Sequence, residues 1–174
     1  MVVGQRPGMP WLPLLIALLL FAGIARADAF DEGLAAYVRA DYANALKAWA
    51  PLAEGGDSNA QHNVGIMYEN GQGMARDHAA AARMYRRAAA QGHADAQFNL
   101  GTLYETGRGV PQDAVRAHMW FNVSATTSLG GMLWSGTAAL AAREAAAAKM
   151  TPAEIAQAQQ MARRCQESNF WACD

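Results

Sequence analysis

The chain has 174 residues, of which 52% are hydrophobic and 17% are charged. This length suits one domain, and the composition is that of a folding chain and not of a disordered one. Alanine runs at 79–82, 88–90 and 145–148 favour closely packed helices over strands. The 14 basic and 15 acidic residues give no basic excess of the kind that nucleic-acid-binding proteins carry. We therefore expect an all-α fold and no nucleic acid as a partner.

The first 27 residues have the pattern of a secretory signal peptide. Arg6 supplies a positive start, an apolar run covers 12–24, and the small residues at 25–27 allow cleavage after Ala27. The run is short against the ~20 residues that span a bilayer, so we expect no stable membrane insertion after cleavage, with a permanent anchor as the alternative. The prediction is a periplasmic or secreted protein. Its mature part, 28–174, keeps 12 basic and 15 acidic groups, a net charge of −3.

The sequence repeats with a period of 36 residues. YENGQGMARD at 68–77 recurs as YETGRGVPQD at 104–113, and eleven identical pairs share this offset, among them Asn63 with Asn99 and Gly65 with Gly101. Apolar residues at i, i+4, i+7 and i+8 from Ala60 indicate an amphipathic first helix in each unit. The period is that of a helical hairpin, and stacked hairpins form a solenoid.

Glycines and aspartates divide each unit into two helices. Gly65 and Gly101 fall inside the first helix, where glycine costs ~1 kcal/mol against alanine, so we expect the second helix to approach them closely. The glycines at 71–73 and 107–109 are expected to end the first helix. Asp77 and Asp113 are placed to cap the second helix, and Ser58 with Gln61 is spaced as a capping box for the first.

The glycine-rich segments lack the features of a phosphate-binding loop. The dinucleotide fingerprint needs GxGxxG after a strand, but Arg76 and Gln112 occupy the third glycine position and a helix precedes each segment. Neither segment has the GK[ST] ending of a nucleotide P-loop. We interpret the glycines as turns between helices.

The pattern AQxNxGxxYExGxG, followed by an aspartate and an alanine-rich helix ending in AAAQG, resembles the Sel-one-like repeat (SLR), a relative of the tetratricopeptide repeat. The resemblance covers 57–128 and implies a short right-handed α-solenoid with repeats at 57–92 and 93–128. It also implies that residues 41–54 form a lone opening helix and that 150–164 forms a closing helix, within C-terminal helices at about 135–165. Thr151, Pro152 and Glu154 fit an N-cap, N1 and N3. The segment 124–137, rich in Ser, Thr and Gly, departs from the repeat, so its helical register stays open.

The family resemblance implies that the first helices of the hairpins line an inner surface that grips a peptide or a protein. A helical wheel anchored at Ala60 places ten residues opposite the core stripe of these helices, and we predict them as the ligand face: His62, Asn63, Ile66, Glu69, Asn70, Phe98, Asn99, Thr102, Glu105 and Thr106. Asn63 and Asn99 carry amides that could hold a peptide backbone, or could instead satisfy neighbouring backbone groups. Phe98 could equally belong to the core between repeats.

The leading hypothesis is an exported adaptor without enzymatic activity, cofactor or metal, which binds an envelope protein or peptide. Regulation of an envelope sensor is a variant of the same hypothesis. The alternative is a β-lactam-binding or cell-wall-peptide hydrolase, an activity described for cysteine-rich exported members of the family. No serine is followed three residues later by lysine, and no KTG occurs. The histidines at 62, 78, 93 and 118 show no HExxH pair, and the arginines at 83, 86 and 87 are interpreted as a solvated face.

Cys165 and Cys173 are the two cysteines of the chain. In an oxidising compartment an even count predicts one disulfide, here closing a small C-terminal loop. The loop contains Phe170 and Trp171, which we expect to fold back onto the last helix as a cap. A homodimer formed through Phe98 or through this aromatic pair would compensate for the small number of repeats.

Overall fold

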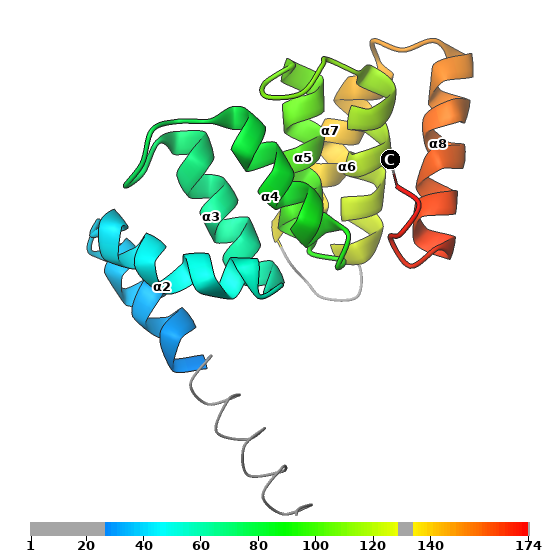
Figure 1. Ribbon diagram of the computed structural model, residues 1–174. Helices are drawn as coiled ribbons and strands as arrows, with labels where there is room; N and C mark the ends of the chain where they lie inside the picture. Colours follow the sequence, from blue (N-terminus) through cyan, green and yellow to red (C-terminus); the bar gives the residue numbers. More distant parts are fainter. Residues whose placement is uncertain (1–26, 129–133, 174) are drawn as a thin grey trace, which may run out of the picture.

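The computed structural model describes residues 27–128 and 134–173, and it is helical throughout (Figure 1). Residues 27–38 form a helix, and seven further helices follow: α2 (Tyr42–Glu54), α3 (Ser58–Asn70), α4 (His78–Ala89), α5 (Ala94–Thr106), α6 (Ala114–Ser128), α7 (Trp134–Ala147) and α8 (Pro152–Glu167). No strand occurs in these two ranges. The all-α fold is confirmed. The predicted signal peptide, apart from Ala27, lies outside the described residues.

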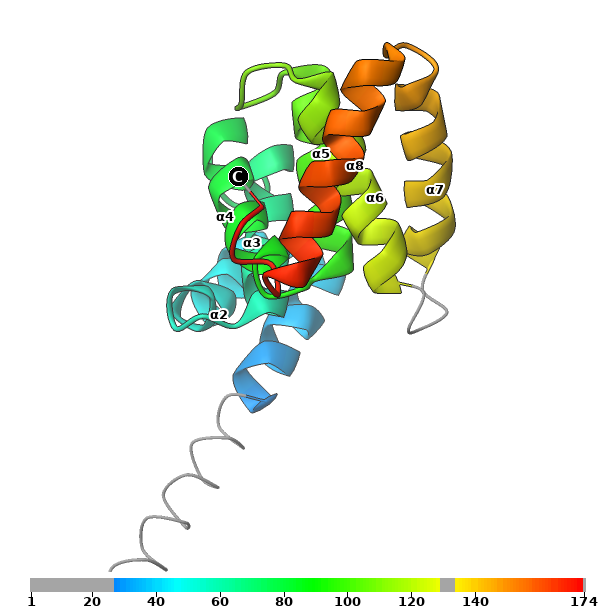
Figure 2. The same ribbon diagram turned by 90° about the vertical axis from the view of Figure 1, so that its right-hand side faces the viewer.

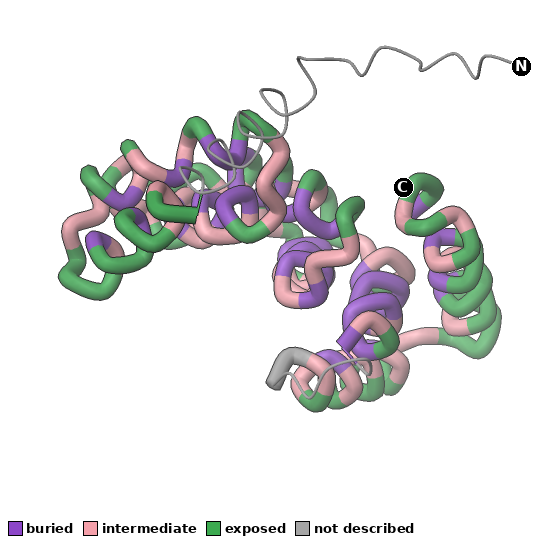
Figure 3. Tube along the Cα trace, turned by 90° about the horizontal axis from the view of Figure 1, so that it is seen from below, coloured by how far each residue is buried: buried purple, intermediate pink, exposed green. Residues whose placement is uncertain are grey.

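The repeat period corresponds to two stacked hairpins, α3 with α4 and α5 with α6. From α2 to α7 each helix contacts the next along the chain, and the helices follow one another in a curve when seen from below (Figure 3). Alanines 81, 88 and 89 on α4 are fully buried and let neighbouring helices approach. This arrangement is the α-solenoid that the repeat predicts.

Gly65 and Gly101 lie where an aromatic ring of the second helix packs on the first. A β-carbon added to Gly65 would lie 2.6 Å from Cε1 of Tyr85, and one added to Gly101 would lie 2.8 Å from Cδ1 of Phe121. Both rings are buried. Glycine in the middle of these helices therefore has the packing reason that the sequence indicated.

The helix ends follow the prediction at the loops but not at the start of α3. Asp77 accepts a hydrogen bond from the backbone of Ala80, and Asp113 accepts one from Arg116, both at 2.9 Å. The turn residues after α3 and α5 are left-handed, with φ of 69° at Gly71 and 68° at Gly107. The predicted capping box of Ser58 and Gln61 is wrong, because the N-cap of α3 is Asp57 and Gln61 is buried.

The opening helix α2 is not alone, which corrects the expectation of a lone helix. It packs against the helix at 27–38, and the indole nitrogen of Trp49 donates to the carbonyl oxygen of Phe30 at 3.0 Å. A β-carbon on Gly33 would lie 2.3 Å from the ring of Trp49, so Gly33 occupies the place that Gly65 has in the next hairpin. Residues 27–54 therefore form a further hairpin of the same design.

Side chains join each hairpin to the next through the ends of the helices. The amide of Gln61 donates to the carbonyl of Ala53 at 3.0 Å, and that of Gln97 donates to Ala89 at 3.1 Å, 36 residues further on. Arg87 donates to the same carbonyl of Ala53 at 2.9 Å. These bonds satisfy carbonyls at the C-terminal ends of helices, which have no partner within their own helix.

The prediction of a solvated face is correct for Arg83 and Arg87, which are exposed, and not for Arg86, which is half-buried. Arg86 donates to the hydroxyl of Tyr104 at 2.9 Å, and Arg87 binds the end of α2. Two of the three arginines therefore connect hairpins.

The C-terminal helices α7 and α8 both pack on α6, with α8 crossing in front of α6 in Figure 2. Thr151 and Glu154 form the capping box that the sequence predicts at the start of α8, with Pro152 as its first residue. Arg143 of α7 donates to the amide oxygen of Asn122 at 3.0 Å. Within the segment whose register stayed open, α6 continues to Ser128 and α7 begins at Trp134; residues 129–133 lie outside the described part.

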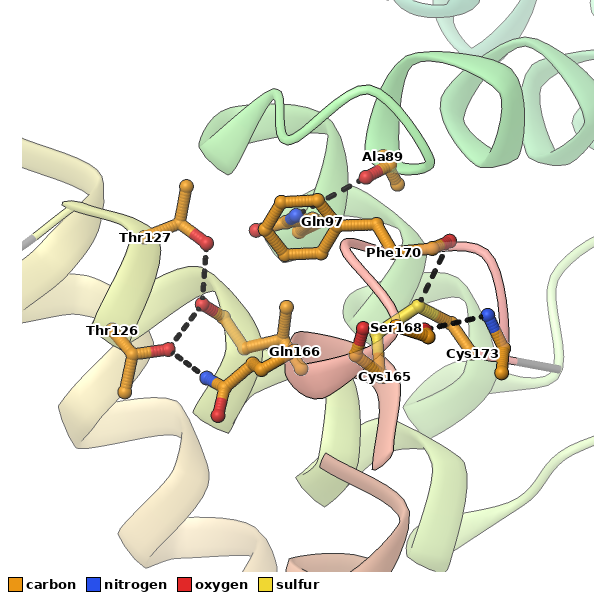
Figure 4. The surroundings of a disulfide bond; sticks show 11 residues. Ala89, Gln97, Thr126, Thr127, Cys165, Gln166, Ser168, Phe170 and Cys173 are labelled. Atoms are coloured by element: carbon orange, nitrogen blue, oxygen red, sulfur yellow. Dashed lines mark hydrogen bonds between the residues drawn. A yellow bond between two sulfur atoms is a disulfide. The ribbon is translucent and has the colours of Figure 1, made fainter. Parts of the chain in front are cut away.

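Cys165 and Cys173 are joined by a disulfide that closes the tail after α8 (Figure 4). The ring of Phe170 lies against Gly92 in the turn between α4 and α5, where a β-carbon on the glycine would be 3.0 Å from Cε2 of the ring. Gln166 hydrogen-bonds Thr126 of α6. Trp171 is 89% exposed, so only Phe170 of the aromatic pair packs, and it packs against a hairpin turn and not only against α8.

Candidate functional site

The predicted ligand face lies on α3 and α5, and most of its side chains are only partly exposed. We call the surface formed by the helix at 27–38, α3 and α5 the A-helix face. Asn70 and Thr106 are exposed, whereas the eight other predicted residues are half-buried.

Three of the predicted residues converge on Tyr85, a buried residue of α4. The hydroxyl of Tyr85 donates to Oε2 of Glu69 at 2.7 Å, and Oε1 of Glu69 pairs with Arg108 at 3.2 Å. Burial, followed by the neighbouring Glu69 carboxylate, raises the pKa of Tyr85, so the phenol stays protonated and donates. The structure thus uses Glu69 to satisfy a buried hydroxyl and joins the two hairpins through Arg108.

Asn99 completes this cluster from α5. Its amide nitrogen lies 3.2 Å from Nε2 of His62, and its side chain also hydrogen-bonds Tyr85. Because the Tyr85 hydroxyl donates its hydrogen bond to Glu69, the phenol oxygen accepts a hydrogen bond from Asn99. The amide nitrogen of Asn99 is therefore the donor to both Tyr85 and His62. In the structure, the side chain of Asn99 therefore contacts other side chains of the protein itself. We call His62, Glu69, Tyr85, Asn99 and Arg108 the Tyr85 cluster.

Two histidines stack beside the cluster. The rings of His62 and His93 have centroids 4.5 Å apart, and Nδ1 of His93 accepts from the backbone of Ala96 at 3.3 Å as the N-cap of α5. Burial, and next the neighbouring His93, lowers the pKa of His62 to about 4, although Asp95 opposes this. Burial also lowers the pKa of His93. Both rings are therefore neutral at pH 7, in keeping with their role as hydrogen-bond acceptors.

The remaining predicted residues of α5 have separate surroundings. Phe98 packs on Phe121 with centroids 5.5 Å apart and borders the core, and Thr102 donates to the carbonyl of Phe98 at 3.2 Å. Glu105 pairs with Lys149 at 3.7 Å. The structure does not gather these side chains into a single site.

Asn63 and Ile66 instead border a small apolar hollow at the N-terminal end of the A-helix face. The hollow has a volume of about 90 Å³, and its other walls are Leu34, Tyr37 and Trp49. The 36-residue repeat in the sequence did not point to these three residues. Trp49 lies 36 residues before Tyr85, which is the repeat period, and this spacing could have indicated the hairpin on which Leu34, Tyr37 and Trp49 lie.

The histidines do not form a metal site in the described residues, where no three His, Cys, Asp or Glu side chains are grouped closely enough to hold an ion. His78 and His118 lie on α4 and α6, and the Nδ1 atom of each is buried without a hydrogen-bond partner. Within the same residues, no helix is both long and apolar enough to cross a membrane.

The fold and its contacts define a stack of helical hairpins with a covered C-terminal end. The Sel1 repeat family model matches residues 58–93 and 94–126, which are the two hairpins α3–α4 and α5–α6. The chain therefore contains two Sel1 repeats, and the resemblance seen in the sequence is confirmed. No curated protein matches the chain.

Several solved structures are similar to this chain, two of them SLR or Sel1 repeat proteins. One is c5321, described as a protective antigen present in uropathogenic Escherichia coli strains displaying an SLR fold, with a TM-score of 0.73 and 28% identity over 83% of this chain. The other is a Sel1 repeat protein from Oxalobacter formigenes, with a TM-score of 0.55 and 32% identity over 58% of this chain. The matches span 31% and 40% of those two proteins, respectively.

Proposed function

We propose that this protein is an adaptor without enzymatic activity, which binds a protein or peptide of the bacterial cell envelope through its A-helix face. Sel1 repeats generally mediate protein–protein interaction and typically serve as non-enzymatic scaffolds. The observation that carries the proposal is the chain's own pair of Sel1 repeats, stacked with a further hairpin into one continuous surface. Repeat stacks of this kind present extended binding surfaces.

Location in the envelope is part of the proposal. It is supported by the signal-peptide pattern at 1–27 and by the disulfide between Cys165 and Cys173, a bond that persists in oxidising compartments. Regulation of an envelope sensor would be one form of this function, with the sensor as the bound partner. A cleavage assay by N-terminal sequencing of the exported protein tests the location, since we expect Asp28 as the first residue.

The proposal is tested by crosslinking in living cells. A photoreactive residue replaces Asn70 or Thr106, which are exposed at the ends of α3 and α5, while the control replaces Arg83, which is exposed on α4. We expect one envelope protein to be captured at positions 70 and 106 and not at 83. Capture of the same proteins at all three positions would contradict binding through the A-helix face. Turnover of a chromogenic β-lactam by the purified protein would instead support the hydrolase alternative.

A further inference from the structure

The hollow beside α3 has the size of one side chain. It is lined by Leu34, Tyr37, Trp49, Asn63 and Ile66 and has a volume of about 90 Å³. Sites for small molecules are usually about 300–1,000 Å³. A small organic ligand therefore does not fit, whereas a side chain that projects from a bound peptide does.

The chemistry of the walls selects an apolar side chain. The indole nitrogen of Trp49 already donates to Phe30 at 3.0 Å, and the hydroxyl of Tyr37 already donates to Gln72 at 3.1 Å. The rest of the lining is hydrocarbon, apart from the amide of Asn63. A charged or hydroxylated side chain would lose most of its hydration there and find only the amide of Asn63 as a partner, and burying an under-paired polar group is unfavourable.

The equivalent position in the next hairpin carries hydrogen-bonded side chains. There, Ile66 replaces Leu34, Glu69 replaces Tyr37, Tyr85 replaces Trp49 and Asn99 replaces Asn63. Tyr85 hydrogen-bonds both Glu69 and Asn99 in the Tyr85 cluster. In the first hairpin, Tyr37 stands in place of the Glu69 carboxylate and Trp49 in place of Tyr85, and the hollow lies beside their rings.

Leu34, which lines the hollow, is flanked on its own helix by an apolar residue and an acidic one. Leu34 is 46% exposed and Val38 is 77% exposed, and they lie one turn apart on the helix at 27–38. Asp31 is exposed one turn before Leu34 on the same side of that helix. A ligand with a basic residue close to an apolar one would complement both the apolar residues and Asp31.

We infer that this hollow is a specificity pocket for an extended segment of a partner protein, which inserts one aliphatic side chain, such as leucine, and places a basic side chain near Asp31. The amide of Asn63 then lies beside the peptide backbone, where it can both donate and accept a hydrogen bond. This inference rests on the proposed function, because it takes the ligand to be part of a protein.

The inference is tested by methyl NMR of the full chain titrated with three peptides. The first is acetyl-Lys-Gly-Leu-Gly-Lys-amide, which places lysine two residues from leucine in either chain direction, about 7 Å away in an extended peptide. In the second peptide serine replaces leucine, and in the third glutamate replaces both lysines. We expect the leucine–lysine peptide to shift the methyl signals of Leu34 and Ile66 saturably in the millimolar range, and the other two to bind about fivefold more weakly or not at all.

Variants distinguish binding in the pocket from nonspecific binding to exposed apolar side chains. Leu34→Asn should abolish the shifts at Ile66, whereas Trp171→Asn, which removes a larger and more exposed apolar side chain elsewhere, should leave them unchanged. Asp31→Asn should remove the preference for lysine over glutamate while retaining the preference for leucine over serine. Unchanged methyl signals of core residues establish that each variant is folded.

Three results would overturn the inference. The first is equal shifts with the leucine and serine peptides. The second is no shift at about 10 mM peptide, a level that a millimolar ligand would saturate. The third is shifts that depend on protein concentration without peptide, which would show that a second copy fills the pocket. If crosslinking at positions 70 and 106 captures a partner but any of these three results is obtained, the proposed adaptor function stands and only the specificity pocket is contradicted.

Discussion

The hydroxyl of Tyr85 donates to Oε2 of Glu69 at 2.7 Å, and this bond joins the two helices of one hairpin at the centre of the A-helix face. Tyr85 is fully buried, and its ring also lies against Gly65. The other oxygen of Glu69 pairs with Arg108 of the following loop. One carboxylate therefore connects a hairpin internally and to its neighbour.

Replacing Tyr85 by phenylalanine tests this connection. The substitution keeps the ring but removes the donor from Glu69 and an acceptor from Asn99, so we expect a loss of about 1–2 kcal/mol in the free energy of unfolding. Urea denaturation measures the loss. Tyr42→Phe is the matched control, because the Tyr42 hydroxyl makes no hydrogen bond within the described residues, and its change should stay within about 0.5 kcal/mol. Equal losses for both variants would contradict the role of the Tyr85 hydroxyl.

Acid should weaken the junction between the two repeats through His62. Its pKa is about 4 in the folded chain against 6.5 in the unfolded chain, so between these values the unfolded state binds more protons. Stability is therefore complete above pH 6.5 and falls as the pH drops towards 4. The difference between the two pKa values corresponds to a loss on the order of 3 kcal/mol.

The measurement is the urea midpoint at pH 7.5, 5.5 and 4.5 for the wild type and for His62→Phe. Phenylalanine is the residue that the next repeat has at this position, as Phe98, and it does not titrate. The variant should lose less stability than the wild type over this range. Hydrogen bonds from Asn44 and Thr151 lower the pKa values of Asp41 and Glu154, respectively, so these carboxylates also lose stabilisation in acid, but they do so equally in both proteins. Parallel pH profiles for the two proteins would show that His62 is not the sensitive group.

Alanine at position 65 tests the close approach of Tyr85. In an ordinary helix, glycine to alanine stabilises by ~1 kcal/mol. Here the added methyl group would meet the ring at 2.6 Å, and overpacking costs about 1–3 kcal/mol, so we expect a net destabilisation. Thermal unfolding measures the sign, and Ala43→Gly on the exposed side of α2 calibrates the helix propensity term alone. A stabilised Gly65→Ala protein would show that the ring can move away at little cost.

The sequence predicts the repeated hairpins well because their signals are local. Gly71, Gly107, Asp77 and Asp113 each act within a few residues of their own position, so spacing alone identifies their roles. The first hairpin was missed because its loop is four residues shorter. Trp49 keeps the 36-residue offset from Tyr85, but Gly33 lies 32 residues before Gly65, so the first helix does not match at the offset where the repeat was sought.

The candidate site was harder to predict because its partners lie on other helices. A helical wheel places Glu69 and Asn99 on the surface of α3 and α5, and it contains no information about Tyr85 on α4. The hydroxyl of that one residue draws both polar side chains into the protein. The hollow likewise depends on residues from the helix at 27–38, α2 and α3 together.

The disulfide between Cys165 and Cys173 should stabilise the packing of Phe170 on the turn between α4 and α5. Asn169 and Phe170 have positive φ values of 54° and 71°, a conformation that non-glycine residues rarely adopt, so the covalent loop must hold this bend. Closing a loop of this length contributes ~2.5 kcal/mol, which corresponds to a midpoint about 5–10 °C higher for the oxidised protein.

Thermal unfolding with and without a thiol reductant measures this shift, and hydrogen exchange at residues 90–93 reports whether Phe170 still covers the turn. We expect faster exchange there after reduction, since the bend around Phe170 loses its covalent support. The double variant Cys165→Ser, Cys173→Ser should resemble the reduced protein and ignore the reductant. Unchanged exchange at the turn in the reduced protein would show that Phe170 stays packed through its own contacts, and that the disulfide acts only on the unfolded chain.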